Sequence, residues 1–311
     1  MSKTKLDFSK PFLVLAPLAG YTDLPFRSVV KKFGADLTIS EMLSSNALAY
    51  NSEKTLKMTT KSENEDPYFL QLAANEKEPL KKAVEIVNTL DGIDGIDLNC
   101  GCPAPKIFNN GAGSQLLGDL DKLSSFIETI KETSNKTYTS AKIRIGVNEK
   151  IPVEIAKAVE KGGADFITVH GRTRAGAYKA PVDYDAIKAI KDAVSIPVIA
   201  NGDIKDYDKY KKVLDHTNAN GAMIGRGAIG KPWIFYQLKN QVDDIDEKIK
   251  KQIILEHFDK MIEFYKEHGS VMFRKHLHTY SKGYNSASEF RENINSINDP
   301  SSMRKLIEEF F

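Results

Sequence analysis

The sequence contains only two cysteines among its 311 residues, Cys100 and Cys102. Two cysteines this close together are poorly placed to bridge each other and too few for a structural zinc site. This excludes a disulfide-stapled secreted fold and favours a reducing compartment. No apolar run reaches the roughly 18 residues of a membrane span, and the N-terminal stretch 1–10 has no apolar signal-peptide core. We therefore expect a cytoplasmic protein without membrane association.

Net charge is also nearly absent, since 44 basic residues face 42 acidic ones. Bulk charge therefore cannot be the means of binding nucleic acid, and any such surface has to be local. Hydrophobic residues make up 41% and charged residues 28%, which is typical of a globular protein and excludes a disordered chain. The length fits either two domains or one α/β barrel of about 250 residues with a smaller addition.

Short apolar runs rich in β-formers alternate with amphipathic stretches such as Ile151–Lys161, Tyr184–Val194 and Asp206–Leu214. Continuous apolar strands between amphipathic helices predict a parallel sheet covered by helices. The eight runs are Phe12–Ala16, Leu37–Ser40, Tyr68–Ala73, Gly95–Asn99, Thr139–Ile145, Phe166–His170, Pro197–Ala200 and Gly221–Gly225.

The number of runs favours a (β/α)8 TIM barrel, with a doubly wound open sheet as the alternative. Polar and glycine residues follow many different runs, and a barrel gathers all its strand ends around one site, whereas an open sheet concentrates them at a switch point. Beyond Gln241 the strand pattern stops, and helical spacing continues through Ile249–Tyr265, Val271–Tyr280 and Ser302–Phe311. We expect a catalytic barrel over residues 1–240 and a helical domain over 241–311.

A cysteine lies where the fourth run ends, in the motif Asp97-Leu98-Asn99-Cys100-Gly101-Cys102-Pro103. Gly101 permits a turn and Pro103 fixes the next backbone angle, so Cys102 is expected to project into the barrel mouth. A free thiol is mostly protonated at neutral pH, so it can donate a proton as well as act as a nucleophile. An isolated cysteine is more often a small buried hydrophobe, which is what we expect of Cys100.

Glycine-rich triplets follow the last two runs, Asn201-Gly202-Asp203 and Gly225-Arg226-Gly227. Loops at these places in barrels often hold phosphate, because glycine lets backbone N–H groups approach the oxygens and arginine adds paired donors. Ordinary turns are the alternative. Together the two triplets favour a phosphate site.

Polar side chains also lie on the other runs, with Gln71 on the third, Lys142 and Arg144 on the fifth, and His170 on the sixth. Lys142 and Arg144 share one face of a strand, and buried charge without a partner is costly. Two cations inside a barrel imply an anionic ligand or carboxylate partners, which Glu41 and Asp97 could supply. His170 alone would more often be a satisfied core residue.

Two segments of the sequence are locally basic. Arg172 and Arg174 follow the sixth run, and no acidic residue occurs between Val271 and Asn285, where Arg274, Lys275 and His276 lie among aromatic residues. Basic stretches with aromatics can bind phosphates and stack on bases. The alternative in both places is solvated surface charge.

These motifs together resemble the tRNA-dihydrouridine synthases, in the order found in that family, over most of residues 11–240. The matching segments are APLAGYTDLPFR at 16–27, SEM at 40–42, LNCGCP at 98–103, HGRTR at 170–174, PVIANGDI at 197–204, MIGRG at 223–227, PWIF at 232–235 and RKH at 274–276.

The resemblance implies an FMN enzyme that reduces a uridine in tRNA to 5,6-dihydrouridine, with NADPH or NADH recharging the flavin. Cys102 matches the catalytic cysteine that gives a proton to C5 after hydride reaches C6, and Asn99 matches a uracil contact. The remaining matches are implied flavin ligands: Pro17, Leu18 and Ala19 in the first loop, Gln71, Lys142 and His170 around the ring, and Asn201, Gly202, Asp203, Gly225 and Arg226 around the phosphate. For tRNA we expect contacts from Arg172, Arg174, Arg274, Lys275 and His276, and we expect a monomer.

Three other functions remain open at this stage. An FMN barrel dehydrogenase acting on a free pyrimidine would not need a separate basic helical domain. A phosphate-binding barrel lyase without flavin would give a colourless protein. An RNA-binding chaperone with a vestigial barrel would not need its Cys102 thiol.

Overall fold

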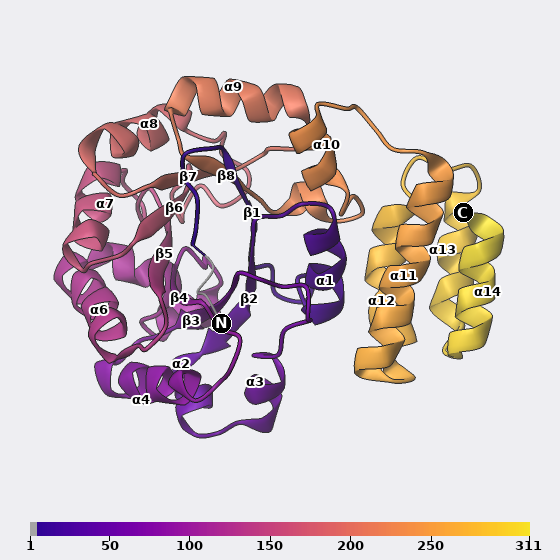
Figure 1. Cartoon of the computed structure of the whole chain (residues 1–311), viewed down its shortest axis with the longest axis horizontal. Coiled ribbons are helices and arrows are strands. Elements are labelled where there is room, and N and C mark those ends of the chain that lie inside the picture. Colours follow the sequence, from indigo (N-terminus) through magenta and orange to yellow (C-terminus); the bar gives the residue numbers. More distant parts are fainter. Residues whose placement is uncertain (1–4) are drawn as a thin grey trace.

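The computed structural model describes residues 5–311, so the first four residues of the N-terminal stretch 1–10 lie outside the described residues. Eight parallel strands are hydrogen-bonded in sequence order into a closed barrel (Figure 1). The strands are β1 (Phe12–Leu15), β2 (Leu37–Ser44), β3 (Tyr68–Ala73), β4 (Gly95–Cys100), β5 (Tyr138–Arg144), β6 (Phe166–His170), β7 (Val198–Asn201) and β8 (Gly221–Ile224). The expected (β/α)8 barrel is confirmed, and strand order excludes the open sheet.

Helices cover the outside of the barrel between successive strands, as Figure 1 shows. Several begin at an aspartate whose side chain accepts a hydrogen bond from the helix's own backbone N–H, which satisfies one of the free donors there. The covering helices are α1 (Leu24–Lys32), α4 (Lys77–Asn88), α6 (Leu120–Thr133), α7 (Pro152–Lys161), α8 (Tyr184–Ala193), α9 (Tyr207–Thr217) and α10 (Ile234–Asn240).

Short helices interrupt the loops at the carboxyl ends of some strands, and the sequence patterns did not predict them. They are α2 (Ser45–Ala49), α3 (Glu53–Lys57), α5 (Pro105–Asn109) and the 3-10 turns η1 (Gly113–Gly118) and η2 (Arg226–Ala228). The predicted strand bounds differ from the observed ones by a residue or so except in β2, which extends four residues further to Ser44.

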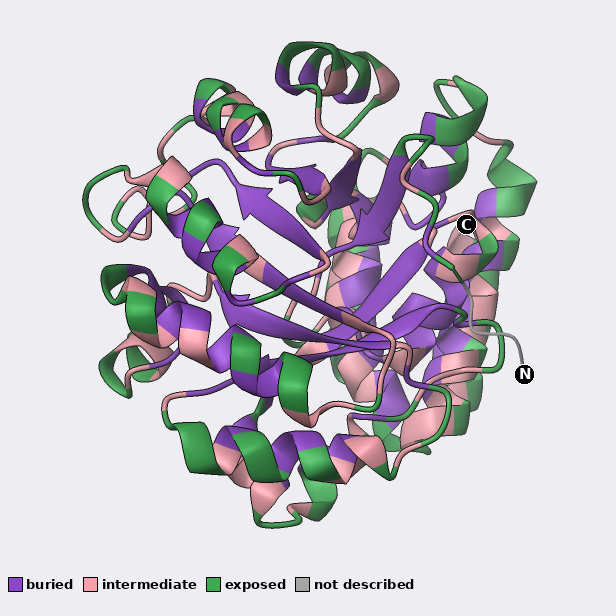
Figure 2. Ribbon diagram, turned by 60° about the vertical axis from the view of Figure 1, so that its left-hand side comes forward, coloured by how far each residue is buried: buried purple, intermediate pink, exposed green. Residues whose placement is uncertain are grey.

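Side chains alternate along each strand between the outer helices and the barrel interior, and the interior residues form an apolar layer and a polar layer. The amino-terminal end is filled by apolar groups, with the ring of Phe69 5.9 Å from the rings of Tyr138 and Phe166. Two residues further along β3 the interior residue is Gln71, and on β4 it is Asp97, both fully buried. The strand centres appear uniformly buried in Figure 2. The polar residues are therefore stacked on an apolar floor and point toward the carboxyl-end opening.

The described helices beyond the barrel are α11 (Glu247–Tyr265), α12 (His268–Tyr280), α13 (Ala287–Ser296) and α14 (Pro300–Phe310). They form a bundle beside α1 and α10 (Figure 1) with its own core, which also takes in Val29 and Trp233 of the barrel. The sequence analysis missed α13 and began the last helix at Ser302, two residues after the observed start of α14. Asp299 in fact caps α14, and Pro300 occupies its first turn, where a missing N–H costs nothing. In residues 5–311, no helix is long and apolar enough to cross a membrane.

A buried ion pair joins α1 to the segment before β3. Arg27 is only 1% exposed, and its Nε donates to Oε1 of Glu65 at 2.7 Å. Its remaining guanidinium groups donate to the carbonyl oxygens of Thr22 and Thr60. Thr38 on β2 and Ser62 donate to the same carboxylate. The pair is fully hydrogen-bonded, which is the condition under which a buried charge is tolerated.

Replacing Glu65 with alanine leaves the Arg27 guanidinium buried without its counter-charge. We expect Glu65→Ala to lower the free energy of unfolding by about 3–5 kcal/mol. The control is Asp192→Ala, which breaks the exposed Lys188–Asp192 pair of α8 and is expected to cost less than about 1 kcal/mol. Chemical denaturation of both variants measures this. Equal losses in the two variants would show that the buried pair has no special role.

Two histidines of the bundle are enclosed where it meets α1. The rings of His257 and His276 lie 4.6 Å apart and neither residue is exposed. Burial lowers the pKa of His276 to about 3 and that of His257 well below its usual value. Both rings are therefore neutral in the folded protein, while an unfolded chain would protonate them near pH 6.5.

The depressed pKa of His276 makes stability pH-dependent in a defined direction. Its contribution is complete above the unfolded value of 6.5 and is lost as the pH falls toward 3. Between about pH 7.5 and 5.5, we expect wild type to lose on the order of 1 kcal/mol more unfolding free energy than His276→Phe. Urea titrations of both proteins at the two pH values test this, and parallel losses would contradict it.

Candidate active site

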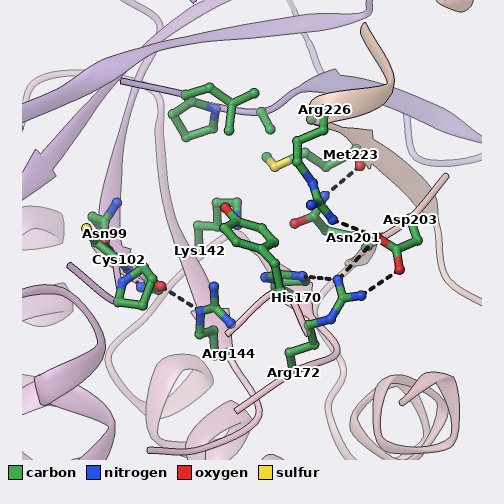
Figure 3. A pocket seen from close by; sticks show the side chains of 18 of the residues that line it. Asn99, Cys102, Lys142, Arg144, His170, Arg172, Asn201, Asp203, Met223 and Arg226 are labelled. Carbon is green, nitrogen blue, oxygen red and sulfur yellow. Dashed lines mark hydrogen bonds and ion pairs between the residues drawn. The ribbon is translucent and has the colours of Figure 1, made fainter. Parts of the chain in front are cut away.

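A pocket opens at the carboxyl ends of the strands, and most of the predicted site residues line it (Figure 3). Every strand or the loop after it contributes, which is the arrangement that barrel closure imposes. The predicted residues found together there are Pro17, Leu18, Ala19, Gln71, Asn99, Cys102, Lys142, His170, Arg172, Asn201, Gly202, Asp203, Gly225 and Arg226. Arg144 lines the pocket as well, beside Met42, Met223 and Tyr178.

A chain of buried hydrogen bonds crosses the barrel interior from Asp97 to the cysteine loop. Asp97 accepts from Ser140 Oγ and from Gln71 Nε2, each at 2.7 Å. Gln71 Oε1 then accepts from Asn99 Nδ2 at 2.7 Å. Asn99 Oδ1 accepts from the backbone N–H groups of Gly101 and Cys102 at 3.2 and 3.0 Å.

The donor–acceptor direction of this series of hydrogen bonds is determined at both of its ends. An ionised carboxylate can only accept, so Gln71 has to turn its NH2 toward Asp97 and its oxygen toward Asn99. Two backbone N–H groups at the other end require the oxygen of Asn99. Both amides are therefore held in one orientation, and the turn that carries Cys102 is attached to the barrel core.

Cys102 is held from the far side as well. Its carbonyl oxygen accepts hydrogen bonds from the N–H and the hydroxyl of Ser114, at 3.1 and 2.8 Å. The residue is partly exposed and lines the pocket, whereas Cys100 belongs to β4 and is fully buried, as expected. The site thus has one accessible thiol on a backbone that is restrained on both sides.

Charges within the barrel are shifted by burial. Desolvation raises the pKa of Asp97 to about 6, against the hydrogen bonds from Gln71 and Ser140 that lower it. Desolvation and the neighbouring Arg144 lower the pKa of Lys142 to about 8. Both groups are mainly charged at neutral pH. In residues 5–311, no hydrogen bond or ion pair is found for the Lys142 ammonium, which lines the pocket.

Arg144, at the end of β5, joins the loops that follow β4 and β6. Its Nε donates to the carbonyl oxygen of Gly101 at 2.8 Å, beside the cysteine. Its Nη1 donates to the carbonyl oxygens of Thr173 and Ala177, in the loop after β6. The cation therefore sets the cysteine turn against the loop opposite it.

One carboxylate lies between two arginines at the β6–β8 side of the pocket, as Figure 3 shows. Asp203 accepts from Arg172 Nη2 at 2.5 Å and from Arg226 Nη2 at 2.9 Å, and the hydrogen bond from Arg172 is the main cause of its lowered pKa. Asp203 has a φ of +49°, and the preceding Gly202 has a φ of +136°. A side chain on Gly202 would meet Val182 at 2.8 Å, so this turn requires glycine.

His170 is kept neutral by the same group of cations. Arg172 Nη1 lies 3.1 Å from His170 Nε2, and because a guanidinium only donates, that nitrogen is unprotonated. Burial, reinforced by Lys142 and Arg144, lowers the pKa of His170 to about 2. The imidazole therefore presents a neutral face to the pocket.

The sequence analysis missed Tyr178, an exposed aromatic residue in the loop after β6. Its ring centroid lies 4.3 Å from the Arg226 guanidinium and 5.9 Å from the centroid of His170. Those contacts place it over the opening. The only signal in the sequence was an aromatic residue shortly after the HGRTR segment.

The predicted RNA contacts do not all lie on the surface. Arg172 is 3% exposed and belongs to the pocket, and Arg174 stacks on Phe108 at 3.6 Å. Arg274 Nη2 donates to the carbonyl oxygen of Ile297 and to Asn298. Lys275 is partly buried, and His276 is fully enclosed, so no RNA contact from His276 is possible in this arrangement.

The pocket has the charge that a phosphorylated cofactor requires. Lys142, Arg144, Arg172, Lys205 and Arg226 line it, with Asp203 as the only acidic residue among the lining residues of the described chain. A single carboxylate shared by two arginines leaves positive charge uncompensated at the glycine-rich turns, which have backbone N–H groups nearby. The donor set therefore fits an anionic group at the β7–β8 side.

Comparisons with known proteins agree on one family. A family model described as dihydrouridine synthase (Dus) matches residues 14–311. The probable tRNA-dihydrouridine synthase of Helicobacter pylori strain J99 is 51% identical over 308 residues, covering 98% of this chain and 94% of that protein. The tRNA-dihydrouridine synthase B of Pasteurella multocida is 37% identical over 310 residues, covering 96% of this chain and 92% of that protein.

Among solved structures, histamine dehydrogenase from Rhizobium sp. 4-9 matches with a TM-score of 0.55 at 12% identity, over 80% of this chain and 48% of that chain. At this identity the likeness shows the barrel fold alone.

The hydrogen-bond chain predicts the effect of changing its polarity. In Asn99→Asp, the new carboxylate oxygen would face Gln71 Oε1, so two acceptors would oppose each other. Turning the Gln71 amide round would instead set its oxygen against the carboxylate of Asp97. We expect this variant to lose about 1–3 kcal/mol of unfolding free energy. The double variant Asp97→Asn/Asn99→Asp restores alternating donors and acceptors with Gln71 turned round, so we expect it to recover part of that loss. If the losses of unfolding free energy in the double-mutant cycle are additive, these hydrogen bonds do not act as a unit.

Proposed function

This chain belongs to the dihydrouridine synthase family, and we propose that it reduces a uridine in tRNA to 5,6-dihydrouridine with FMN as cofactor and NADPH or NADH as reductant. The observation that carries the proposal is one pocket holding a restrained, accessible thiol at Cys102 opposite a cluster of cations around glycine-rich turns. A phosphate-binding lyase would have no use for the thiol. A chaperone would need neither the thiol nor the cluster of cations.

The cofactor would be held by residues on every side of the pocket. We assign its phosphate to the turns at Asn201–Asp203 and Gly225–Arg226, where positive charge exceeds negative charge. Pro17, Leu18 and Ala19 would contact it from the loop after β1, and Gln71, Lys142 and His170 from the barrel interior. When bound, the flavin supplies a hydride to C6 of the uracil.

Lys142 and His170 would set the electrostatics around the ring. The ammonium of Lys142 is unpaired among the described residues and enters the pocket as a positive charge, which stabilises negative charge on a bound aromatic ring. The neutral His170 adds no second charge. His170 can be neutral beside the charged Lys142 because its Nε2, which faces the donating guanidinium of Arg172, carries no proton.

Cys102 would provide the proton that completes the reduction. Addition of hydride at C6 leaves negative charge toward C5, and the thiol of Cys102 gives its proton to that carbon. The hydrogen bonds to Asn99 and Ser114 restrain the cysteine backbone during this transfer. The second N–H of the Asn99 amide is free to donate to the uracil.

The target base has to leave the folded tRNA to reach the pocket. We propose Arg174 and Arg274 as RNA contacts, since each keeps part of its side chain at the surface. Tyr178, exposed over the opening, is a further aromatic surface for an extruded nucleotide.

The function is tested by mapping dihydrouridine in tRNA. Purified protein, FMN, NADPH and tRNA from cells lacking this chain should yield dihydrouridine at one position. Expression of the chain in those cells should restore the same position. A protein that stays colourless with added FMN favours a lyase, and reduction of free uracil in place of tRNA favours the pyrimidine dehydrogenase.

The role of Cys102 can be tested by measuring the two half-reactions separately. These are the reduction of FMN by NADPH and the reduction of uridine by the reduced FMN. We expect Cys102→Ala to bind FMN and to have that FMN reduced by NADPH at the wild-type rate, while dihydrouridine formation falls about 10²–10⁴-fold, the usual contribution of a general acid. Cys100→Ala, which removes the neighbouring buried thiol, should keep most of the activity. If both half-reactions fail together in Cys102→Ala, the thiol is not the proton donor.

A further inference from the structure

Helix α12 of the C-terminal bundle packs against the loop that follows β1. The ring of Tyr21 in that loop meets the ring of His276 edge to face, with centroids 5.5 Å apart. Phe26, at the start of α1, stacks on His276 at 5.5 Å and an interplanar angle of 25°. The ammonium of Lys275 lies 5.5 Å from the centroid of Tyr21.

The same helix supports the chain that follows β8. Gly230, at φ +76°, is so close to α12 that an added Cβ would lie 3.0 Å from the Cβ and the carbonyl oxygen of Thr279. Three residues later the ring of Trp233 stacks on Tyr280, with centroids 6.4 Å apart. One face of α12 therefore touches both loops.

These two loops adjoin each other at the pocket. A Cβ on Gly225 would lie 3.4 Å from Ala16 Cβ and 3.9 Å from Leu18 Cδ1. The β1 loop carries Pro17–Ala19 and the β8 loop carries Gly225–Arg226, which line the pocket from neighbouring strands. Helix α12 therefore lies behind a continuous part of the pocket wall.

His276 has the properties of a packing group at this junction. It is fully buried, and neither ring nitrogen has a hydrogen-bond partner in the part of the chain that the structure describes. The ring contributes its shape between Tyr21, Phe26 and His257, since its polar atoms make no bond. Such an arrangement is unsuited to a residue that contacts a nucleic acid.

We propose that His276 and Lys275 are positioning residues, through which helix α12 holds the β1 loop beside the β8 loop in the arrangement that binds FMN. Loops held by few contacts sample several conformations, and the apparent affinity for a ligand falls with the fraction of molecules in the competent one. The helical bundle thereby becomes part of the cofactor site. This inference rests on the proposed function, because FMN is the ligand of that function.

The experiment compares three substitutions in α12 of the full-length, flavin-depleted protein. His276→Ala removes the ring that packs on Tyr21 and Phe26, while His276→Phe keeps a ring and discards the two unpartnered nitrogens. His278→Ala is the matched control, since this histidine faces Asn295 on the exposed side of the helix. The dissociation constant of FMN is measured by flavin fluorescence, at a temperature where thermal unfolding shows each variant folded.

We expect His276→Ala to bind FMN about tenfold more weakly, as when the competent fraction of loops falls to about a tenth. His276→Phe and His278→Ala should bind FMN as wild type does. Wild-type FMN affinity in His276→Ala overturns the proposal. If that variant does not fold, Lys275→Met, which keeps the aliphatic stem and removes the charge over Tyr21, serves in its place with the same two outcomes.

A second measurement distinguishes positioning from RNA contact. Loss of a phosphate contact reduces the slope of log tRNA affinity against log salt by about 0.7–0.9, whereas a positioning residue leaves the slope unchanged. A reduced slope in Lys275→Met together with unchanged FMN affinity would assign Lys275 to the RNA and refute the inference. A wild-type protein that does not bind FMN contradicts the proposed function itself, and so is told apart from failure of this inference.

Discussion

Closure of eight parallel strands is the constraint on which the site depends. Since side chains alternate along a strand, β3, β4 and β5 direct Gln71, Asp97 and Ser140 to the same interior layer, above the aromatic floor around Phe69. The side chains in that layer bond directly to one another, and the acceptor-only carboxylate of Asp97 orients each amide above it. Groups at the centre of the barrel therefore position the Cys102 turn through these hydrogen bonds, in addition to the contacts within its own loop.

Charge balance explains how this interior tolerates several cations. Asp97 lies below Lys142, and Asp203 is shared by Arg172 and Arg226, while Arg144 is satisfied by backbone carbonyl oxygens. The arrangement gives each of these arginines a hydrogen-bond acceptor and leaves Lys142 without a partner among the described residues. Positive charge is thus concentrated where an anionic or electron-rich ligand would lie. Burial keeps His170 neutral in the middle of this group.

The bundle beyond the barrel is joined to it by aromatic packing of α11 and α12 against α1 and the β1 loop, and by the Lys32–Glu256 ion pair. His257, His276 and Phe273 form the centre of this junction, and Trp233 extends the bundle core onto the barrel. Residues that look basic and accessible in the sequence, such as Arg172 and His276, are used here for structure. Their hydrogen bonds and stacking partners come from segments that are remote in sequence, so a linear pattern could not reveal them.

The amino-acid sequence by itself determined the barrel, because apolar runs separated by amphipathic stretches leave few ways to bury both faces of a parallel sheet. It also located most of the pocket residues, since a closed barrel gathers the loops after all its strands around one opening. It could not indicate Tyr178 or the pairing of Arg172 with Asp203, and it missed α13. Those depend on where long loops and remote helices meet in space. Only the tertiary structure decided that Asp97, Gln71 and Asn99 form one chain and that His276 is enclosed, because burial and hydrogen-bond partners are properties of the packed molecule.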